Sequence, residues 1–229
     1  GHVVVAFVYT TPWDNYLVAT SVWWYDPALV TGYTIGWVPI EEYTFFVLQT
    51  ILTGMWVVWL MMKLKRPASG NFRERPTIRW GLTGTAVLLW VISTIFLVFG
   101  SMSANYLTLI LSWALLPIIL QFAFGADILW YYGRLLFWGI VPATLYLGAA
   151  DALAIRAGTW TISSEQTVGI KLGGILPLEE FIFFLVTNIL VVFGVTLVMA
   201  IQSHERVTHL PAAVQRFLPA PKTNASLTP

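Results

Sequence analysis

Two acidic motifs of the same type occur in this 229-residue sequence. The segment Pro39-Ile-Glu-Glu-Tyr-Thr-Phe-Phe-Val-Leu-Gln-Thr-Ile-Leu52 recurs as Pro177-Leu-Glu-Glu-Phe-Ile-Phe-Phe-Leu-Val-Thr-Asn-Ile-Leu190, with seven of fourteen positions identical. An aspartate precedes each copy at a matched distance, 27 residues before the first glutamate in one and 28 in the other. Such self-similarity indicates an internal repeat. The candidate catalytic carboxyl groups are Asp14, Glu41, Glu42, Asp151, Glu179 and Glu180.

These residue types suit acid–base chemistry on an apolar molecule. Adjacent residues of a helix lie about 100° apart, so one glutamate of each pair can face a helix bundle while the other meets a loop. Two phenylalanines continue the face of the second glutamate, three and four residues further on. A carboxyl group there can protonate an alkene, and aromatic faces and a carboxylate can stabilise the resulting cation. The aromatic residues predicted to contact a substrate are Phe45, Phe46, Phe183, Phe184, Trp24 and Trp160.

A purely structural interpretation of the same motifs also exists. Pro39 and Pro177 suit the first position of a helix, where acidic groups are stabilised by the helix dipole. Aromatic residues can belong to the belts that mark membrane interfaces. Two copies, each with an upstream aspartate, favour function instead, because ionisable groups within apolar spans are costly.

Apolar segments of membrane-spanning length surround these residues. Apolar residues make up 58% of the chain and charged residues only 10%, which excludes an ordinary soluble domain with about 25% charged residues. About 20 helical residues cross a bilayer. Six segments of about that length predict an all-α, polytopic transmembrane helix bundle: 3–25, 39–62, 78–99, 106–124, 135–156 and 177–201.

The repeat predicts how these helices are organised. Repeat one covers about 3–62, a linking helix about 78–99, and repeat two about 106–201, within a single transmembrane domain of residues 1–210. An even number of crossings separates the two copies, so the repeats are parallel and both glutamate pairs lie on the same side. Symmetry argues for a further helix before residue 3, seven in all, so the start of the sequence looks truncated or trimmed. Residues 211–229 are expected to form a flexible cytoplasmic tail.

Lysine and arginine positions predict the orientation in the membrane. Ten of the twelve lie in the loop between the second and third segments, between the fourth and fifth, or after the sixth. Only Arg156 and Lys171 lie on the other side. The positive-inside rule makes the cationic loops and the C-terminus cytoplasmic. The acidic motifs then face the outer side.

Several other classes of function lack support. A net charge of +1 gives no field that would recruit nucleic acid. The chain has no Cys, which excludes thiolate chemistry and Cys-based zinc sites. The stretch Gly81-Leu-Thr-Gly84 lacks the full glycine pattern of a dinucleotide site. We therefore expect no cofactor and no metal.

The sequence resembles the integral-membrane lycopene cyclases over about residues 13–200. The motifs that carry the resemblance are Trp13-Asp-Asn-Tyr-Leu-Val18, Trp23-Trp24-Tyr25, Gly36-Trp-Val-Pro-Ile-Glu-Glu-Tyr-Thr-Phe-Phe46, Ala150-Asp-Ala-Leu-Ala-Ile-Arg-Ala-Gly-Thr-Trp-Thr-Ile-Ser163 and Pro177-Leu-Glu-Glu-Phe-Ile-Phe-Phe184. Members of that family occur as paired bacterial subunits, as single chains, and as a domain fused to phytoene synthase in fungi. They usually begin with one more helix.

The resemblance implies conversion of the ψ ends of lycopene to β-ionone rings, through γ-carotene to β-carotene, without net redox change. It assigns protonation or cation stabilisation to an inward glutamate of each pair. It assigns a proton relay, or the base that takes the final proton, to Asp14 and Asp151. The expected partners are lycopene and other carotenoids within the bilayer and a fused or associated phytoene synthase or other carotenoid enzyme; a homo-oligomer is also open.

Three alternatives remain at this stage. A related cyclase acting on C50 carotenoids, or making ε or γ rings, would use the same acids and remove a different proton. A proton-coupled transporter would also use parallel repeats with acids in the membrane. A retinal photoreceptor would need a lysine in the last helix, and 177–201 contains none.

Overall fold

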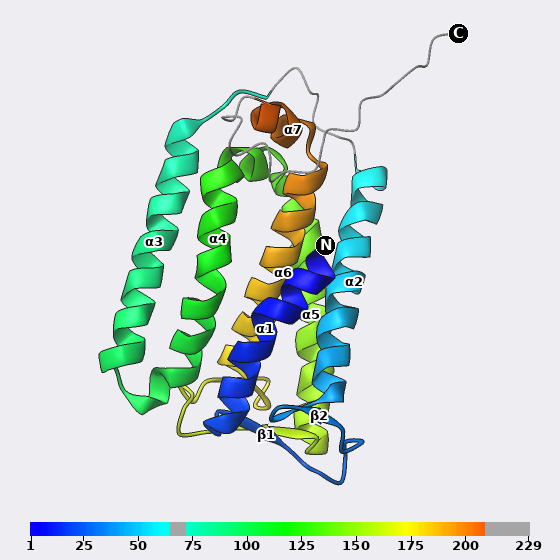
Figure 1. The fold of residues 1–229 in the computed structure, drawn as a ribbon, viewed down its shortest axis with the longest axis vertical. Coiled ribbons are helices and arrows are strands. Elements are labelled where there is room, and N and C mark those ends of the chain that lie inside the picture. Colours follow the sequence, from blue (N-terminus) through cyan, green and yellow to red (C-terminus); the bar gives the residue numbers. More distant parts are fainter. Residues whose placement is uncertain (65–71, 209–229) are drawn as a thin grey trace.

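The computed structural model describes residues 1–64 and 72–208 as an all-α bundle (Figure 1). The predicted tail, 211–229, lies outside the described residues. The helices are α1 His2–Ala19, α2 Ile40–Lys63, α3 Pro76–Phe99, α4 Asn105–Tyr131, α5 Gly133–Ala157, α6 Leu178–Met199 and α7 Ile201–Thr208, with a 3-10 turn η2 at Met102–Ala104 before α4. The prediction of an all-α bundle is confirmed.

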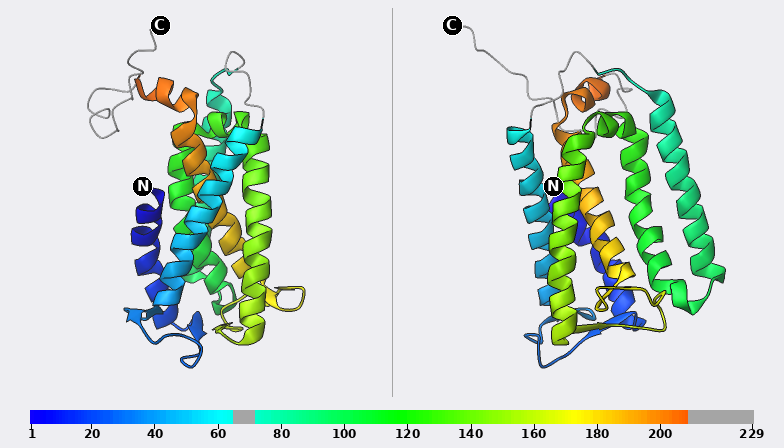
Figure 2. Two further views of the ribbon diagram at one scale, coloured as in Figure 1. Left: turned by 90° about the vertical axis from the view of Figure 1, so that its right-hand side faces the viewer. Right: turned by 180° about the vertical axis from the view of Figure 1, so that it is seen from behind.

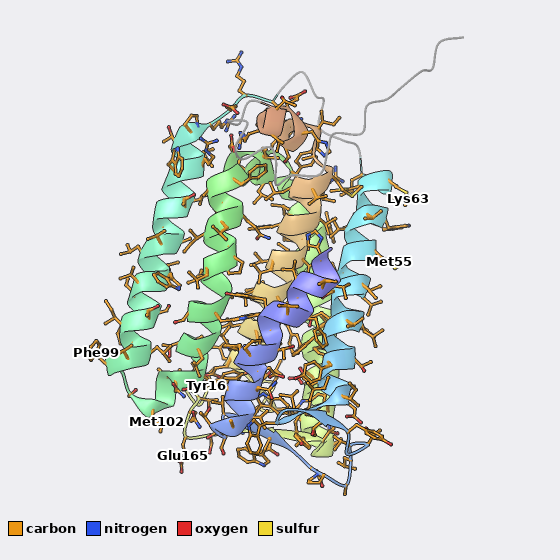
Figure 3. All side chains as sticks on the ribbon, viewed as in Figure 1. Tyr16, Met55, Lys63, Phe99, Met102 and Glu165 are labelled. Carbon is orange, nitrogen blue, oxygen red and sulfur yellow. The ribbon has the colours of Figure 1, made fainter. Side chains whose placement is uncertain are left out.

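Five of the described helices, α2 to α6, are long and apolar enough to cross a membrane. The shorter and more polar α1 does not reach that level of hydropathy within the described chain. Large apolar side chains cover the outside of the bundle, as contact with lipid requires. Met55 and Phe99, labelled in Figure 3, are 68% and 83% exposed. The protein is a membrane protein.

The helices form a compact group with one outlying member (Figures 1 and 2). α6 packs against α4, α5 and α2, and α2 also packs against α1 and α5. α3 packs mainly against α4 and forms the edge of the molecule. This placement suits the predicted role of α3 as the helix that links two repeats.

Short strands connect the helices at one end of the bundle. β1 (Trp23–Tyr25) pairs antiparallel with β4 (Trp160–Ile162). β2 (Thr34–Ile35) and β3 (Val38–Pro39) form one hairpin, and β5 (Lys171–Leu172) and β6 (Leu176–Pro177) form another. Each half of the chain therefore has the same order: a helix, a strand, a hairpin and a second helix. This correspondence, with β1 and β4 joining the halves, supports the predicted repeat.

Several predicted helix limits differ from the structure. The first helix was expected to reach residue 25 but ends at Ala19, because Ser21 adopts a positive φ of 55° and the next residues pair as β1. The fourth was expected to end at residue 124, but α4 continues to Tyr131 through non-helical angles at Gly125. The last was expected to reach residue 201, but extended backbone at Ala200 ends α6.

Polar side chains join α2 to α5 and α6 within the bundle. The Gln49 amide nitrogen donates to Thr187 Oγ1 at 2.7 Å, and Thr53 Oγ1 donates to Asn188 Oδ1 at 2.7 Å. The Asn188 amide nitrogen in turn donates to Thr144 Oγ1 at 3.2 Å. Such hydrogen bonds specify which helix faces meet in an apolar environment.

A cluster of ion pairs around Arg206 lies at the other end of the bundle. Arg206 in α7 pairs with Asp127 at 2.8 Å and with Glu74 at 3.0 Å, and it also donates to the Phe124 carbonyl oxygen. Burial opposes the charge on Arg206, but its hydrogen bonds and the charges of Asp127 and Glu74 outweigh burial and raise its pKa. α7 is thereby held across the end of α4.

Candidate active site

A small cavity, about 40 Å³ in volume, lies between the helices at the end of the bundle that carries the strands. Asp14 of α1, Glu42 of α2, Asp151 of α5 and Glu180 of α6 all line it. Each half of the chain thus contributes one aspartate and one glutamate. The tertiary structure brings four of the six predicted carboxyl groups together.

Each aspartate of the cavity accepts a hydrogen bond from an indole of its own half. Trp23 Nε1 donates to Asp14 Oδ1 at 3.1 Å, and Trp160 Nε1 donates to Asp151 Oδ1 at 2.8 Å. The pairing of β1 with β4 fixes the backbone that carries both indoles. The second oxygen of each aspartate is buried and has no hydrogen-bond partner among the described residues. Each carboxyl group is therefore oriented through one oxygen and keeps the other available.

The two glutamates of each pair occupy different places. Glu42 and Glu180 line the cavity. Glu41 Oε1 instead accepts from the backbone N–H of Thr31 at 2.7 Å. Glu179 Oε1 accepts in the same way from the backbone N–H of Val168 at 2.7 Å. The prediction that all four glutamates belong to the catalytic set is not matched by the geometry, because Glu41 and Glu179 turn toward the loops by the 100° that separates neighbouring helical residues.

The two inward glutamates differ in their hydrogen bonds. The hydroxyl of Tyr106, at the start of α4, donates to Glu180 Oε1 at 2.7 Å. The Glu42 carboxyl group accepts no hydrogen bond within the described parts of the chain. The sequence analysis did not identify Tyr106, because it reaches Glu180 from 74 positions away in the chain. The hydroxyl makes the two halves of the cavity chemically unequal.

Aromatic rings form the walls between these acids. Phe45, Phe183, Phe184 and Trp160 all line the cavity, as predicted. The rings of Phe45 and Phe184 meet edge to face with centroids 5.8 Å apart, and those of Phe183 and Phe184 are 5.5 Å apart. Ring faces with this negative quadrupole can stabilise a cation.

Two of the aromatic residues predicted to contact a substrate do not line this cavity. Trp24 is 44% exposed and points away, because neighbouring residues of a strand face opposite sides and the inward one is Trp23. Phe46 is buried but lines a neighbouring groove. Trp13 and Trp23 line the cavity although neither was predicted to do so. The alternation of β1 could have identified Trp23 had the strand been recognised.

The fold and the cavity define an integral-membrane protein with a cavity lined by four carboxyl groups and aromatic rings. In the described ranges 1–64 and 72–208, no group of three or more His, Cys, Asp or Glu residues is arranged to hold a metal ion. A family profile described as lycopene cyclase matches residues 2–61 and 103–199. The unmatched stretch between them contains α3. The chain belongs to the lycopene cyclase family.

Relatives with known names agree with this assignment. The chain is 40% identical over 200 residues to a lycopene beta-cyclase of Halobacterium salinarum, covering 84% of this chain and 78% of that protein. It is 35% identical over 222 residues to a bifunctional lycopene cyclase/phytoene synthase of Aspergillus oryzae, covering 94% of this chain and 37% of that protein. A protein of the same description from Podospora anserina is 37% identical over 199 residues, covering 84% of this chain and 33% of that protein. No solved structure matches the chain.

Family membership makes the chain an enzyme whose reaction is a cyclisation, an isomerisation in type. The sequence-based resemblance is confirmed. The photoreceptor and transporter alternatives receive no support from these relatives.

Proposed function

We propose that this chain is a lycopene β-cyclase, which closes β-ionone rings at the ψ ends of lycopene through γ-carotene to β-carotene. The observation that carries the proposal is the single cavity in which four carboxyl groups meet aromatic walls inside a membrane bundle. The name of the Halobacterium salinarum relative supplies the substrate and the ring type.

The reaction needs one proton in and one proton out. A carboxyl group adds a proton to the terminal double bond of the ψ end and leaves a tertiary cation. A second double bond of the same chain attacks this cation and closes the six-membered ring, which moves the positive charge onto a ring carbon. Loss of a proton from the neighbouring ring carbon that carries the polyene chain gives the β ring. Atoms and charge balance without an oxidant, a reductant or a metal, so the residues of the cavity suffice.

The geometry supports a division of labour between the glutamates. Glu42 is the proton donor, because no described hydrogen-bond donor holds its carboxyl group as an acceptor. Glu180 faces the developing cation as a carboxylate, because Tyr106 donates to it at 2.7 Å. A hydroxyl that donates to a carboxylate oxygen stabilises the ionised form. The neighbouring rings of Phe45 and Phe184 lie on the cavity wall, where they can share this stabilisation.

The two aspartates are the groups that accept and return protons. Each keeps one buried oxygen without a partner in the described chain, while an indole N–H fixes the other. This arrangement suits a base that must face one substrate carbon. Because all four carboxyl groups line one cavity, one composite site serves both ends of the substrate in turn, and the monocyclic product leaves before it reacts again.

The orientation and the partners follow from the same proposal. The cationic loops and the C-terminus lie in the cytoplasm, and the acid cavity lies near the outer face, by the positive-inside rule. Lycopene arrives within the bilayer. The fungal relatives named above combine a cyclase and a phytoene synthase in one chain, which favours an associated phytoene synthase for this protein as well.

The test replaces each glutamate of the two motifs singly with glutamine in membranes supplied with lycopene. We expect Glu42→Gln and Glu180→Gln to lower the rate of cyclisation at least about 100-fold, the size typical of a lost acid–base group. Glu41→Gln and Glu179→Gln keep the rate within a few-fold, because a glutamine carbonyl still accepts from the loop N–H. The control is Glu165→Gln, in the exposed outer loop.

Chromatography of the products completes the test. β-Carotene is the expected end product, with γ-carotene appearing first. Near-normal rates for both Glu42→Gln and Glu180→Gln would refute the assignment of the acids. An ε or γ ring, or activity only with a C50 substrate, would refute the assignment of ring type or substrate while leaving the acids in place.

A further inference from the structure

A second hollow, which we call the polyene groove, lies beside the acid cavity. Its volume is about 130 Å³, and α1, α2, α4 and α6 all contribute to its lining. The proposed chemistry does not use it, since the four carboxyl groups lie in the other cavity. The lining includes Ala6, Phe46, Trp113 and Val191, all apolar.

The groove and the acid cavity share a wall. Phe183 lines both. Trp13 of the cavity stacks on Trp113 of the groove with ring centroids 4.6 Å apart, and on Phe183 with centroids 5.7 Å apart. A molecule that reaches from one space to the other would pass these three rings.

Most polar groups along the groove are engaged with the protein itself. The Gln49 amide nitrogen donates to Thr187 Oγ1 at 2.7 Å, and the Gln121 amide nitrogen donates to the Leu190 carbonyl oxygen at 2.9 Å. The hydroxyl of Tyr9 donates to the Trp113 carbonyl oxygen at 2.8 Å. The surface offered to a ligand is therefore mostly carbon, which favours a hydrocarbon over a polar ligand.

The length of the groove fits part of the conjugated chain of a long polyene. Along α6 it continues from Phe183 to Val191, eight residues or about 12 Å. Lycopene is about as long as the hydrocarbon core is thick, about 30 Å. At the far end lies Val5, a groove residue that is 66% exposed on the lipid-facing surface.

We propose that the polyene groove binds the conjugated chain of a linear carotenoid, with one ψ end in the acid cavity and the distant half leaving past Val5 into the lipid. This inference rests on the proposed function and adds the binding site for the part of the substrate that does not react. The substrate enters sideways between α1 and α4 and reverses in the bilayer before its second end reacts.

Blocking substitutions test the groove apart from the chemistry. Lycopene that co-purifies with the detergent-solubilised protein is measured in the Glu42→Gln/Glu180→Gln double variant, where turnover is removed. We expect Ala6→Trp to reduce the bound lycopene at least tenfold. Val5→Trp, at the rim, gives a several-fold reduction and is the second variant, since an exposed position tolerates a larger side chain. The matched control is Val4→Trp, because Val4 is 65% exposed on the same helix and does not line the groove.

The outcomes separate the two proposals. Equal lycopene in the Ala6, Val5 and Val4 variants would overturn the groove, and so would a double variant that binds no lycopene. A double variant that binds lycopene and still cyclises it would overturn the acid assignment and leave the groove standing. In the active chain, Ala6→Trp raises KM for lycopene, whereas the control Val4→Trp leaves both KM and kcat for lycopene unchanged.

Discussion

At the scale of single residues, the hydrogen bond from Tyr106 to Glu180 distinguishes the two inward glutamates of the acid cavity. Asp14 and Asp151 occupy equivalent positions of the two repeats, and so do Glu42 and Glu180. Within the described residues, only Glu180 accepts a hydrogen bond from a tyrosine. Two carboxyl groups in one cavity can act as acid and as charge stabiliser only if their surroundings differ. The tyrosine is therefore a positioning residue for Glu180.

Tyr106→Phe should lower kcat for cyclisation about tenfold, corresponding to roughly 1.4 kcal/mol in activation free energy. The ring remains in place and only the hydroxyl that holds Glu180 is lost. Bound lycopene should be unchanged, and the effect should largely disappear when Glu180 is already Gln. Tyr146→Phe, at a position 66% exposed, is the control. An unchanged kcat for Tyr106→Phe would show that the hydroxyl has no part in the reaction.

At the scale of helices and strands, contacts between helices position the glutamates of the acid cavity. α2 and α6 carry the two inward glutamates at their starts and are joined deeper in the bundle by the Thr53–Asn188 hydrogen bond. Asn188 is fully buried and also donates to Thr144 of α5. This polar contact fixes the register in which the glutamates of the two halves face each other.

Thr53→Val should destabilise the bundle by about 1 kcal/mol, the size measured for hydrogen bonds between helices in membranes. The substitution conserves shape and leaves Asn188 Oδ1 without its donor. Denaturation in mixed micelles measures the change, and Thr44→Val is the matched control, since Thr44 Oγ1 donates only to Ile40 of its own helix. Equal stability of the two variants would contradict a structural role for the contact.

At the scale of the whole molecule, charged side chains are distributed unequally between the two ends of the bundle. Lys63 lies at one end of α2, and Glu165 lies among the loops at the opposite end of the bundle (Figure 3). Arg134 and Arg206 belong to the end that carries α7, while Lys171 belongs to the end that carries the strands. The positive-inside rule then predicts one orientation in the membrane.

Cysteine labelling tests this orientation directly, because the chain contains no Cys. In intact cells, an impermeant maleimide should label Lys171→Cys and should leave Arg134→Cys unlabelled until the membrane is opened. Both positions are exposed, so accessibility within the fold does not limit either reaction. The reverse pattern would place the acid cavity on the cytoplasmic side.

The sequence alone determined the helix bundle and predicted the two acidic motifs that supply the carboxyl groups of the cavity. Spans of apolar residues are recognisable because a bilayer requires a fixed helix length, and the repeat is recognisable because both copies keep the Pro-x-Glu-Glu pattern. The 100° between neighbouring helical residues also separated an inward glutamate from an outward one in each pair. These properties are local, so short stretches of sequence contain them.

Only the tertiary structure decided which of those residues meet. The pairing of β1 with β4 joins residues far apart in the chain, and it selected Trp23 over Trp24 as the partner of Asp14. Tyr106 approaches Glu180 across 74 positions of sequence, a contact without any local pattern. Phe46 moved from the predicted acid site to the polyene groove because the crossing of α1, α2, α4 and α6 divides the interior into two spaces. Packing between helices depends on all of their side chains at once, and for that reason a single motif does not predict it.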